Sequence, residues 1–546
     1  MRPPSRACTD HRTRDPTWSA RRAASECPRN GRGERMKLGI DFGTTRTVVA
    51  AVQDGRYPVA CFQAGDALAD HVPGFAARTD AGVVFGADAA AHGVPQRLVR
   101  SIKRVASRIA PDERVEGLGL TALELVTEYV RALRRALVES SNLDLDPAEP
   151  LEAMVAVPAS ASARQRYVTL EAFRAAGIEV LGMINEPTAA AIEYAHRDLR
   201  QLGPRSPKRS LVVYDLGGGT FDASTISLAG QRFELIASDG IGQLGGDDFD
   251  VEILVLALET LGIDPATVDV SNATALLERC RQAKEGLGAN SRRLLVDLSD
   301  LVPGAEPAIL PVAELYARCQ PHVERTLECL DRLLGDLPFG GRELAAIYVA
   351  GGSAVFPPVL RSLRQRHARK IKLAPLPHAA TAVGLAVAAD PDAGVFVREA
   401  TTRHVGVWRE GADGREKIFD PLVAKDDLPQ SDEPLVVQRR YQPAHRVGHL
   451  RFVECTRLGA HGDPVGELTP LGEVLFPYDP HLADRDLREH AAQRTADLAG
   501  HEIVETYTYG RDGRVSVVIE NRTRGHRREY RLGESPRSAR AAHSSA

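Results

Sequence analysis

Two glycine-rich turns, each directly after an aspartate, carry the residue types best suited to chemistry. Asp41 is followed by Phe42, Gly43, Thr44 and Thr45, and a second turn, 215–222, reads DLGGGTFD. Glycine lets a bulky phosphate approach the backbone, and successive N–H groups in such a turn point into one concavity. Carboxylates beside a phosphate repel it unless a divalent cation lies between them. The pattern therefore predicts a site for a magnesium-bound nucleotide.

Short apolar runs must position these turns. Residues 37–41 and 47–49 flank the first turn, and residues 211–214 and 223–228 flank the second. Such runs predict two β-hairpins, and hence two similar halves facing each other across the site. A glycine triplet alone is more often a flexible loop, so the repetition carries the argument. Asp41-Phe42-Gly43 also matches a protein-kinase element, but no glycine-rich loop, strand lysine or HRD precedes it.

A third glycine turn lies in Ile347–Pro357, IYVAGGSAVFP. A buried strand is expected to run into Gly351, Gly352 and Ser353, with a helix over 359–367. Glycines where a strand feeds a helix suit contact with the phosphates or sugar of a nucleotide. Taken alone, this piece fits equally well a turn that needs glycine only for packing.

In this order, the segments resemble the heat-shock protein 70 (DnaK-type) chaperones. The shared motifs are GIDFGTT at 39–45, INEPTAAAIEYA at 184–195, DLGGGTFD at 215–222, LGGDDFD at 244–250 and VAGGS at 349–353. The resemblance covers 36 to about 532 and is looser in the last third. It implies an α/β actin-like (ribonuclease-H-like) two-lobed ATPase domain followed by an all-β sandwich domain. It also implies an ATP-dependent chaperone, a slow ATPase that binds extended or unfolded polypeptide and acts in protein folding and the stress response.

The resemblance also implies roles for individual residues. ATP or ADP and Mg are the expected cofactors, with Asp41 and Asp215 holding the metal through its waters. The expected catalytic residues are Lys103, Glu186, Asp215, Thr220 and Asp222. The expected nucleotide contacts are Asp41, Gly43, Thr44, Thr45, Gly217, Gly218, Gly219, Thr220, Gly245, Gly246, Lys284, Gly351, Gly352 and Ser353. From sequence alone, a lysine in a basic helix such as Lys103 more often faces solvent.

The adenosine side departs from the family. In the helix that holds ribose and base, Lys284 is kept, whereas the glutamate, arginine and serine are replaced by Arg281, Glu285 and Gly288. The arginine that stacks on adenine is Val355, and the aspartate of the NPDEAVA motif is His378. We therefore expect ATP binding that is weaker or less base-selective than is usual for the family.

Further residues bear on coupling and partners. Pro158 and Arg166 match the residues through which the family relays nucleotide state to the peptide domain. The arginine used to bind J-domain co-chaperones is Gly182 here, which argues against dependence on an ordinary J-domain partner. A nucleotide-exchange factor remains a possible partner. No helical lid follows the β-rich part, so we expect weak holding and fast release of peptide.

The domain organisation is predicted as follows. Residues 1–35 are disordered or untranslated, with Met36 as the real start; 36–390 form the ATPase domain; 391–400 form the linker, with its apolar part at 392–397; 401–533 form the β-sandwich; and 534–546 form a disordered tail. In the sandwich, Val436, Val437 and Tyr441 either line a peptide groove or fill the core, and core is the expectation.

Composition excludes some classes of function. The 546 residues are 43% hydrophobic and 26% charged, which is typical of an ordinary globular protein. The net charge of −4 argues against a nucleic-acid binder, and no apolar run is long enough to cross a bilayer. Seven scattered cysteines without metal-ligand spacing indicate free thiols, as in the reducing cytoplasm.

Two other classes remain open. An actin-like nucleotide-dependent scaffold would share the ATPase lobes, but it normally has no appended β-domain. A sugar kinase of the same superfamily would need a catalytic base for a substrate hydroxyl and lacks these paired motifs. Within the chaperone interpretation, a client-specific regulator with little refolding activity is a real variant.

Overall fold

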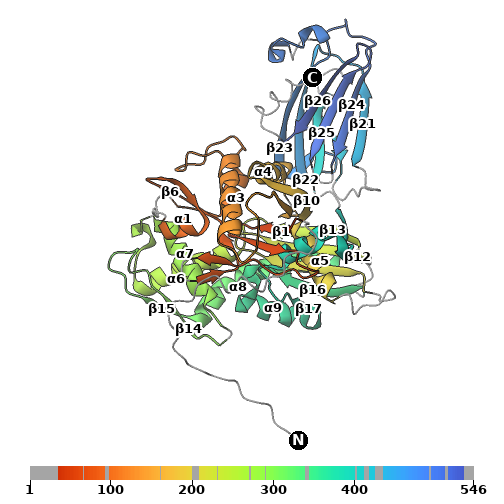
Figure 1. Cartoon of the computed structure of the whole chain (residues 1–546). Coiled ribbons are helices and arrows are strands. Elements are labelled where there is room, and N and C mark those ends of the chain that lie inside the picture. The colour runs from red at the N-terminus through yellow and green to blue at the C-terminus, as the bar shows by residue number, and fades with distance from the viewer. Residues whose placement is uncertain are drawn as a thin grey trace.

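The computed structural model contains two α/β lobes and a β-sandwich (Figure 1). It describes residues 35–533 except 65–66, 93–97, 160, 199–207, 230–231, 270–271, 289, 338–342, 400–402, 411–416, 425–433, 491–493 and 511–513. The disordered ends predicted for 1–35 and 534–546 therefore lie outside the described residues, apart from position 35. Within the described part, no helix has the length and apolarity needed to span a membrane.

The first lobe is built on a mixed sheet with strand order β10-β9-β1-β2-β5. β1 and β2 form the first predicted hairpin, in which Asp41 pairs with Val48. Its strands are β1 (Lys37–Phe42), β2 (Arg46–Ala51), β5 (Val72–Pro73), β9 (Leu151–Val157) and β10 (Ile178–Asn185). The helices around it are α1 (Gly86–His92), α2 (Ile102–Arg108), α3 (Ala122–Glu139) and α4 (Ala163–Ala175). Smaller sheets contain β3 (Phe62–Ala64), β4 (Ala67–Ala69), β6 (Phe75–Thr79), β7 (Gly82–Phe85) and β8 (Leu98–Arg100).

The second lobe repeats this plan around a sheet ordered β17-β16-β11-β12-β13-β18. β11 and β12 form the second predicted hairpin, with Asp215 opposite Asp222. Its strands are β11 (Ser210–Leu216), β12 (Phe221–Ala229), β13 (Arg232–Ile241), β16 (Leu344–Ala350), β17 (Ile371–Leu373) and β18 (Phe396–Glu399). The other elements are α5 (Glu186–Asp198), α6 (Gly246–Leu261), α7 (Ala273–Glu285), α8 (Val312–Gly335), α9 (Pro357–His367), β14 (Arg293–Val296) and β15 (Ala308–Pro311).

Helix α10 (Ala380–Ala389) crosses α5 where the two lobes meet. Both helices are rich in alanine, which allows their backbones to approach closely. A Cβ added at Gly384 would lie 1.7 Å from the carbonyl oxygen of Ala189. Small side chains at this crossing therefore hold the lobes together and place the two hairpins opposite each other.

The β-sandwich follows as two antiparallel sheets, ordered β20-β19-β22-β23 and β21-β24-β25-β26. Its strands are β19 (His404–Glu410), β20 (Lys417–Val423), β21 (Leu435–Tyr441), β22 (Val447–Leu458), β23 (Pro464–Pro477), β24 (Ile503–Tyr509), β25 (Val515–Asn521) and β26 (His526–Leu532). Val437 packs against its core, as expected. Tyr441 packs against the core and also lines a cavity, and Val436 is 53% exposed. The predicted fold class is thus confirmed.

The sandwich is joined to the lobes both through the chain and by direct contact. Strand β18, within the predicted linker, pairs in parallel with β13 of the second lobe. The sandwich also meets α4 of the first lobe, where the Ala163 backbone N–H donates to both Glu454 carboxylate oxygens at 3.0 and 3.2 Å. Figure 1 shows β22 and β23 beside α4 at this junction.

Candidate functional site

A pocket of about 350 Å³ lies between the lobes, lined by both hairpin turns. We call it the interlobe pocket. The turns share one backbone pattern, since Gly43 N–H donates to the Arg46 carbonyl at 3.1 Å and Gly217 N–H donates to that of Thr220 at 3.0 Å. They face each other closely, because a Cβ added at Gly218 would lie 2.4 Å from Thr45 Cγ2. The predicted opposition of the two hairpins is therefore present.

The third glycine turn completes the wall on the side of the second lobe. Gly351 adopts φ 87°, a left-handed conformation that favours glycine. A Cβ there would lie 2.3 Å from the Leu216 carbonyl oxygen and 2.4 Å from Asp215 Oδ1. Glycine at this position is thus required by both conformation and space, and it keeps β16 close to the second hairpin.

Three aspartates at the turns carry strongly perturbed acidity. Burial, followed by the Glu186 carboxylate, raises the pKa of Asp41 to about 7, and Lys103 opposes the rise. Burial and then Glu186 likewise raise the pKa of Asp222 to about 7. For Asp215, burial and the neighbouring carboxylates raise the pKa well above its ordinary value. Four acidic side chains therefore crowd one pocket.

Lys103 is the cation placed among these carboxylates. Its Nζ donates to Glu186 Oε1 at 2.7 Å, with both side chains 15% exposed, and it lies 5.6 Å from the centre of the Phe42 ring. Ser101, just before α2, has φ 62°, an uncommon conformation for a residue other than glycine. This turn aims Lys103 at the pocket, so the lysine is not on a solvated face.

The arrangement suits a hydrated cation better than a directly ligated one. Within the described residues, no three His, Cys, Asp or Glu side chains are close enough to hold a metal ion together. Burial, followed by the neighbouring Glu186 carboxylate, raises the pKa values of Asp41, Asp215 and Asp222, and one lysine faces this group of acidic side chains. Mg²⁺ usually keeps several waters and takes one or two carboxylates. The residues present therefore fit Mg²⁺ held through water.

Most of the predicted site residues line the interlobe pocket. They are Asp41, Gly43, Thr44, Thr45, Lys103, Pro158, Glu186, Asp215, Gly217, Gly218, Thr220, Asp222, Gly246, Lys284, Gly351, Gly352 and Ser353. Gly219 and Gly245 lie beside the pocket but do not line it. The Gly219 carbonyl accepts from Arg104, and Gly245 N–H donates to Asp248 Oδ2 at 2.7 Å.

Arg166, predicted for coupling, lies outside the interlobe pocket. It is buried on α4, and its Nη2 donates to Asn185 Oδ1 at 2.8 Å. Asn185 ends β10 immediately before Glu186, which begins α5. Arg166 therefore touches the residue next to a pocket carboxylate.

Lys284 reaches the pocket but is already engaged. Its Nζ lies 2.7 Å from Asp250 Oδ1 and donates to the Gly246 carbonyl at 2.6 Å. Burial raises the pKa of Asp250, and the Lys284 ammonium opposes that rise. The lysine kept from the family pattern thus also anchors α7 to the start of α6.

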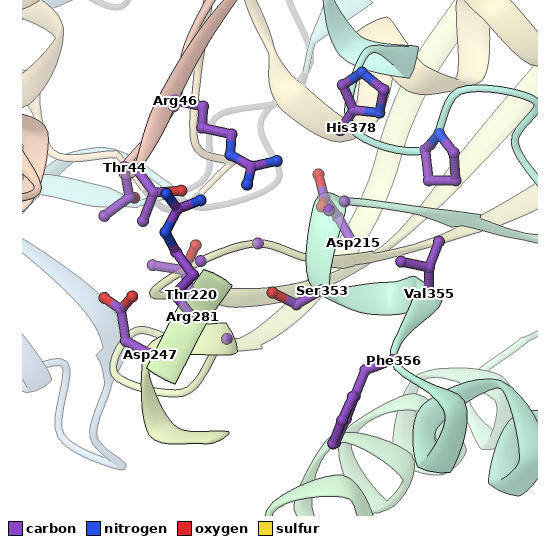
Figure 2. A pocket seen from close by; sticks show the side chains of 18 of the residues that line it. Thr44, Arg46, Asp215, Thr220, Asp247, Arg281, Ser353, Val355, Phe356 and His378 are labelled. Carbon is purple, nitrogen blue, oxygen red and sulfur yellow. The ribbon is translucent and has the colours of Figure 1, made fainter. Parts of the chain in front are cut away.

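Arg46 was missed by sequence reasoning. It begins β2, projects into the pocket and pairs with Glu285 of α7. Arg281 also donates to Glu285, at 2.9 Å, so the two guanidinium groups lie close together, as Figure 2 shows. Burial lowers the pKa of Arg46, and Glu285 opposes that shift. This wall of the interlobe pocket is thus an ion cluster that joins the two lobes.

A second interlobe contact involves another departure from the family, His378. Its Nε2 lies 2.7 Å from Asp70 Oδ2, and hydrogen bonds from His378 and His71 hold the Asp70 pKa well below its usual range. Val355, at the position where the resemblance implies an arginine stacked on adenine, lines the pocket and is 48% exposed. Residues 70 and 378 are 308 positions apart, so no local sequence pattern could have predicted that they are in contact.

The lobes with their paired hairpins, followed by the sandwich, define a two-lobed actin-like ATPase fold with an appended β-sandwich. Residues 141–404 match the family model described as Hsp70 protein.

The chain is also similar to curated proteins that are named as chaperones. The chain is 30% identical over 349 residues to a protein named Chaperone protein HscA homolog from Cupriavidus taiwanensis, covering 60% of this chain and 54% of that one. Homologs of the same name from Ralstonia nicotianae and Burkholderia multivorans are 31% and 32% identical, over 66% of this chain and 59% of theirs. The chain thus spans somewhat over half the length of these relatives. Over residues 141–404 the chain is similar to the Hsp70 family, and at about 30% identity it is divergent from these relatives.

Proposed function

We propose that this protein binds and hydrolyses Mg-ATP in the interlobe pocket and couples the reaction to binding of an extended polypeptide by the β-sandwich. One observation carries the proposal: two matched glycine hairpins face each other around crowded carboxylates and one lysine. The HscA-type relatives are named as chaperones, which supports the same function class.

The backbone N–H groups of 217–218 and the hydroxyls of Thr44, Thr45 and Thr220 would contact the phosphates. Asp41 and Asp215 would hold Mg²⁺ through its waters, and the ion would supply charge neutralisation when bound. Phosphoryl transfer to water needs alignment and charge stabilisation more than covalent help. Lys103 would face the transferred phosphoryl group, with Glu186 holding its ammonium in place.

Selectivity for the base should be low. Arg281 and Glu285 are bonded to each other, and Lys284 is bonded to Asp250. These groups must give up existing partners before they can recognise a ribose or a base. ATP and GTP should therefore bind with similar affinity, and a strong preference for ATP in a titration would contradict this interpretation.

A chain of contacts supports coupling between the sandwich and the pocket. Glu454 of β22 accepts from the Ala163 amide at the N-terminus of α4, where the helix dipole favours a carboxylate. Four residues into the same helix, Arg166 holds Asn185, which precedes Glu186 of the pocket. Undocking of the sandwich would thus release the first turn of α4, and with it a constraint on the Lys103–Glu186 pair.

We also propose the domain limits predicted from the sequence, a linker over 391–400, and a cytoplasmic location. The described cysteines are all unpaired: Cys61, Cys280, Cys319, Cys329 and Cys455. Free thiols fit a reducing compartment.

The proposal is tested by single-turnover ATP hydrolysis with and without an unfolded peptide. Lys103→Ala should lower the rate by about 10²–10³-fold, as for loss of one preorganised charge in a closed site, while retaining nucleotide binding. Lys372→Ala, an exposed lysine on β17, is the matched control. Hydrolysis by Lys103→Ala at the wild-type rate would refute the assigned role, and absence of hydrolysis in the wild type would refute the ATPase itself.

A further inference from the structure

The β-sandwich contains a cavity of about 1290 Å³ at one end, bordered by β19, β20, β21 and β22. We call it the sandwich cavity. Its lining is rich in charge, with basic side chains outnumbering acidic ones. The basic residues are Arg409, Lys417, Arg439, Arg440, Arg451 and Arg494, and the acidic ones are Glu410 and Asp420. Apolar and aromatic side chains such as Trp408, Val447 and Leu450 line the same cavity, so its charged groups lie beside apolar surface.

The floor of this cavity is a fixed ion network. Arg409 pairs with Asp420 at 2.6 Å and with Glu505 at 2.7 Å, and the Glu505 side chain is fully buried. Glu505 also accepts from the Tyr441 hydroxyl at 2.5 Å and the Tyr507 hydroxyl at 2.6 Å. An apolar side chain entering here would remove water from charged groups without replacing its hydrogen bonds, which is unfavourable.

The rim of the cavity carries basic side chains whose ion pairs within the protein are weak. Arg440 lies 3.9 Å from Glu502, and Arg451 lies 3.4 Å from Glu473, with all four side chains about half exposed. Exposed pairs of this kind contribute only about 0–1 kcal/mol each. Within the described residues, Lys417 is exposed and has no ion-pair partner. Carboxylates of a ligand can therefore replace Glu502 and Glu473 at little cost.

We propose that the sandwich cavity binds an extended polypeptide segment rich in aspartate and glutamate, whose carboxylates pair with Lys417, Arg440 and Arg451. The inference rests on the proposed polypeptide-binding function and specifies its substrate class. A short acidic segment is favoured over a nucleic acid because the basic residues are gathered at the cavity. The whole chain carries a net charge of −4, which opposes a long polyanion that extends beyond this basic patch.

The test uses the full chain and fluorescence anisotropy with labelled peptides of about 10 residues, long enough to cross the cavity at about 3.3 Å per residue. One peptide alternates Glu with Ser, a second has Gln in place of Glu, and a third alternates Leu with Ser. Each is measured with ADP and with ATP. We expect the Glu peptide to bind at least about tenfold more tightly than the other two, with an affinity that falls as salt is raised.

Charge reversal locates the site. Arg440→Glu combined with Arg451→Glu should weaken the Glu peptide at least about tenfold and leave the Leu peptide unchanged. Arg527 is an exposed arginine on β26, away from the cavity. Arg527→Glu is the matched control and should change the affinity for neither the Glu peptide nor the Leu peptide. Unchanged thermal unfolding of each variant shows that the fold is retained.

The outcomes are distinguishable. Binding of the Leu or Gln peptide as tightly as the Glu peptide would overturn the acidic substrate class and leave the chaperone-like function standing. Binding of no peptide in either nucleotide state would refute the polypeptide-binding function itself. Displacement of the Glu peptide by a single-stranded oligonucleotide, with the same dependence on Arg440 and Arg451, would reassign the cavity to general polyanions and overturn the proposal.

Discussion

Replacement of one crowded carboxylate should stabilise the empty protein while impairing its reaction. Burial and Glu186 raise the pKa of Asp222 from an ordinary 3.8 to about 7. Ionising such a group at neutral pH costs about 4 kcal/mol, at 1.36 kcal/mol per pKa unit. Asp222 faces the pocket and keeps some exposure to water, so we expect the actual cost of ionisation to be about half of this value. Asp222→Asn should therefore gain about 2 kcal/mol at pH 7.5 without nucleotide or Mg²⁺.

The sign of the pH dependence follows from the same shift. Between about pH 4 and 7 the unfolded chain loses the Asp222 proton while the folded chain keeps it. This carboxyl therefore lowers the free energy of unfolding as pH rises through that range, and its effect levels off above about pH 7. Asp41, with a pKa also raised to about 7, acts in the same direction. The free energy of unfolding of Asp222→Asn should therefore decrease less with rising pH than that of the wild type.

The assay is thermal unfolding from pH 5 to 8 in EDTA, repeated with Mg-ATP. A gain of about 2 kcal/mol should raise the unfolding midpoint of the lobes by about 3 °C, from an entropy of about 2.1 cal/mol/K per residue. With Mg-ATP the wild type should gain more than the variant. Asp297 lies on an exposed loop, where its carboxylate accepts hydrogen bonds from Ser299. Asp297→Asn is the control and should change neither the pH dependence of the unfolding midpoint nor its increase with Mg-ATP. A lower midpoint for Asp222→Asn in EDTA at pH 7.5 would refute the reasoning.

Three further substitutions test the pocket and its coupling. Gly218→Ala places a Cβ 2.4 Å from Thr45 Cγ2 and should weaken ATP binding at least about tenfold by calorimetry, so wild-type affinity would contradict the opposed turns. Arg46→Ala removes the partner of Glu285 across the lobes. It should speed release of a fluorescent nucleotide about two- to fivefold in stopped flow, and slower release would count against the interlobe contact. Glu454→Ala removes the acceptor of the α4 amide. It should abolish peptide stimulation of hydrolysis while retaining the basal rate, and intact stimulation would exclude this route.

Local chemistry explains what could be predicted without a structure. The turns at 41–45 and 215–222 follow from glycine, hydroxyl and β-branched residues within a few positions of one another, so their hairpins and carboxylates were expected and are present. The β-rich part predicted from residue 401 onward is also present within the described residues. Lys103 needed the family resemblance, because a lysine in a basic helix carries no signal of direction until the backbone at Ser101 is known.

Tertiary structure alone decided which charges meet. Arg46 and Glu285 lie 239 positions apart, and Asp70 and His378 lie 308 apart, so no spacing rule relates them. The sequence alone determined two glycine-rich turns beside aspartates and a β-rich segment downstream. Folding decided that ion pairs join the two lobes at the interlobe pocket and that the sandwich cavity is charged, because both depend on which side chains long-range packing brings together.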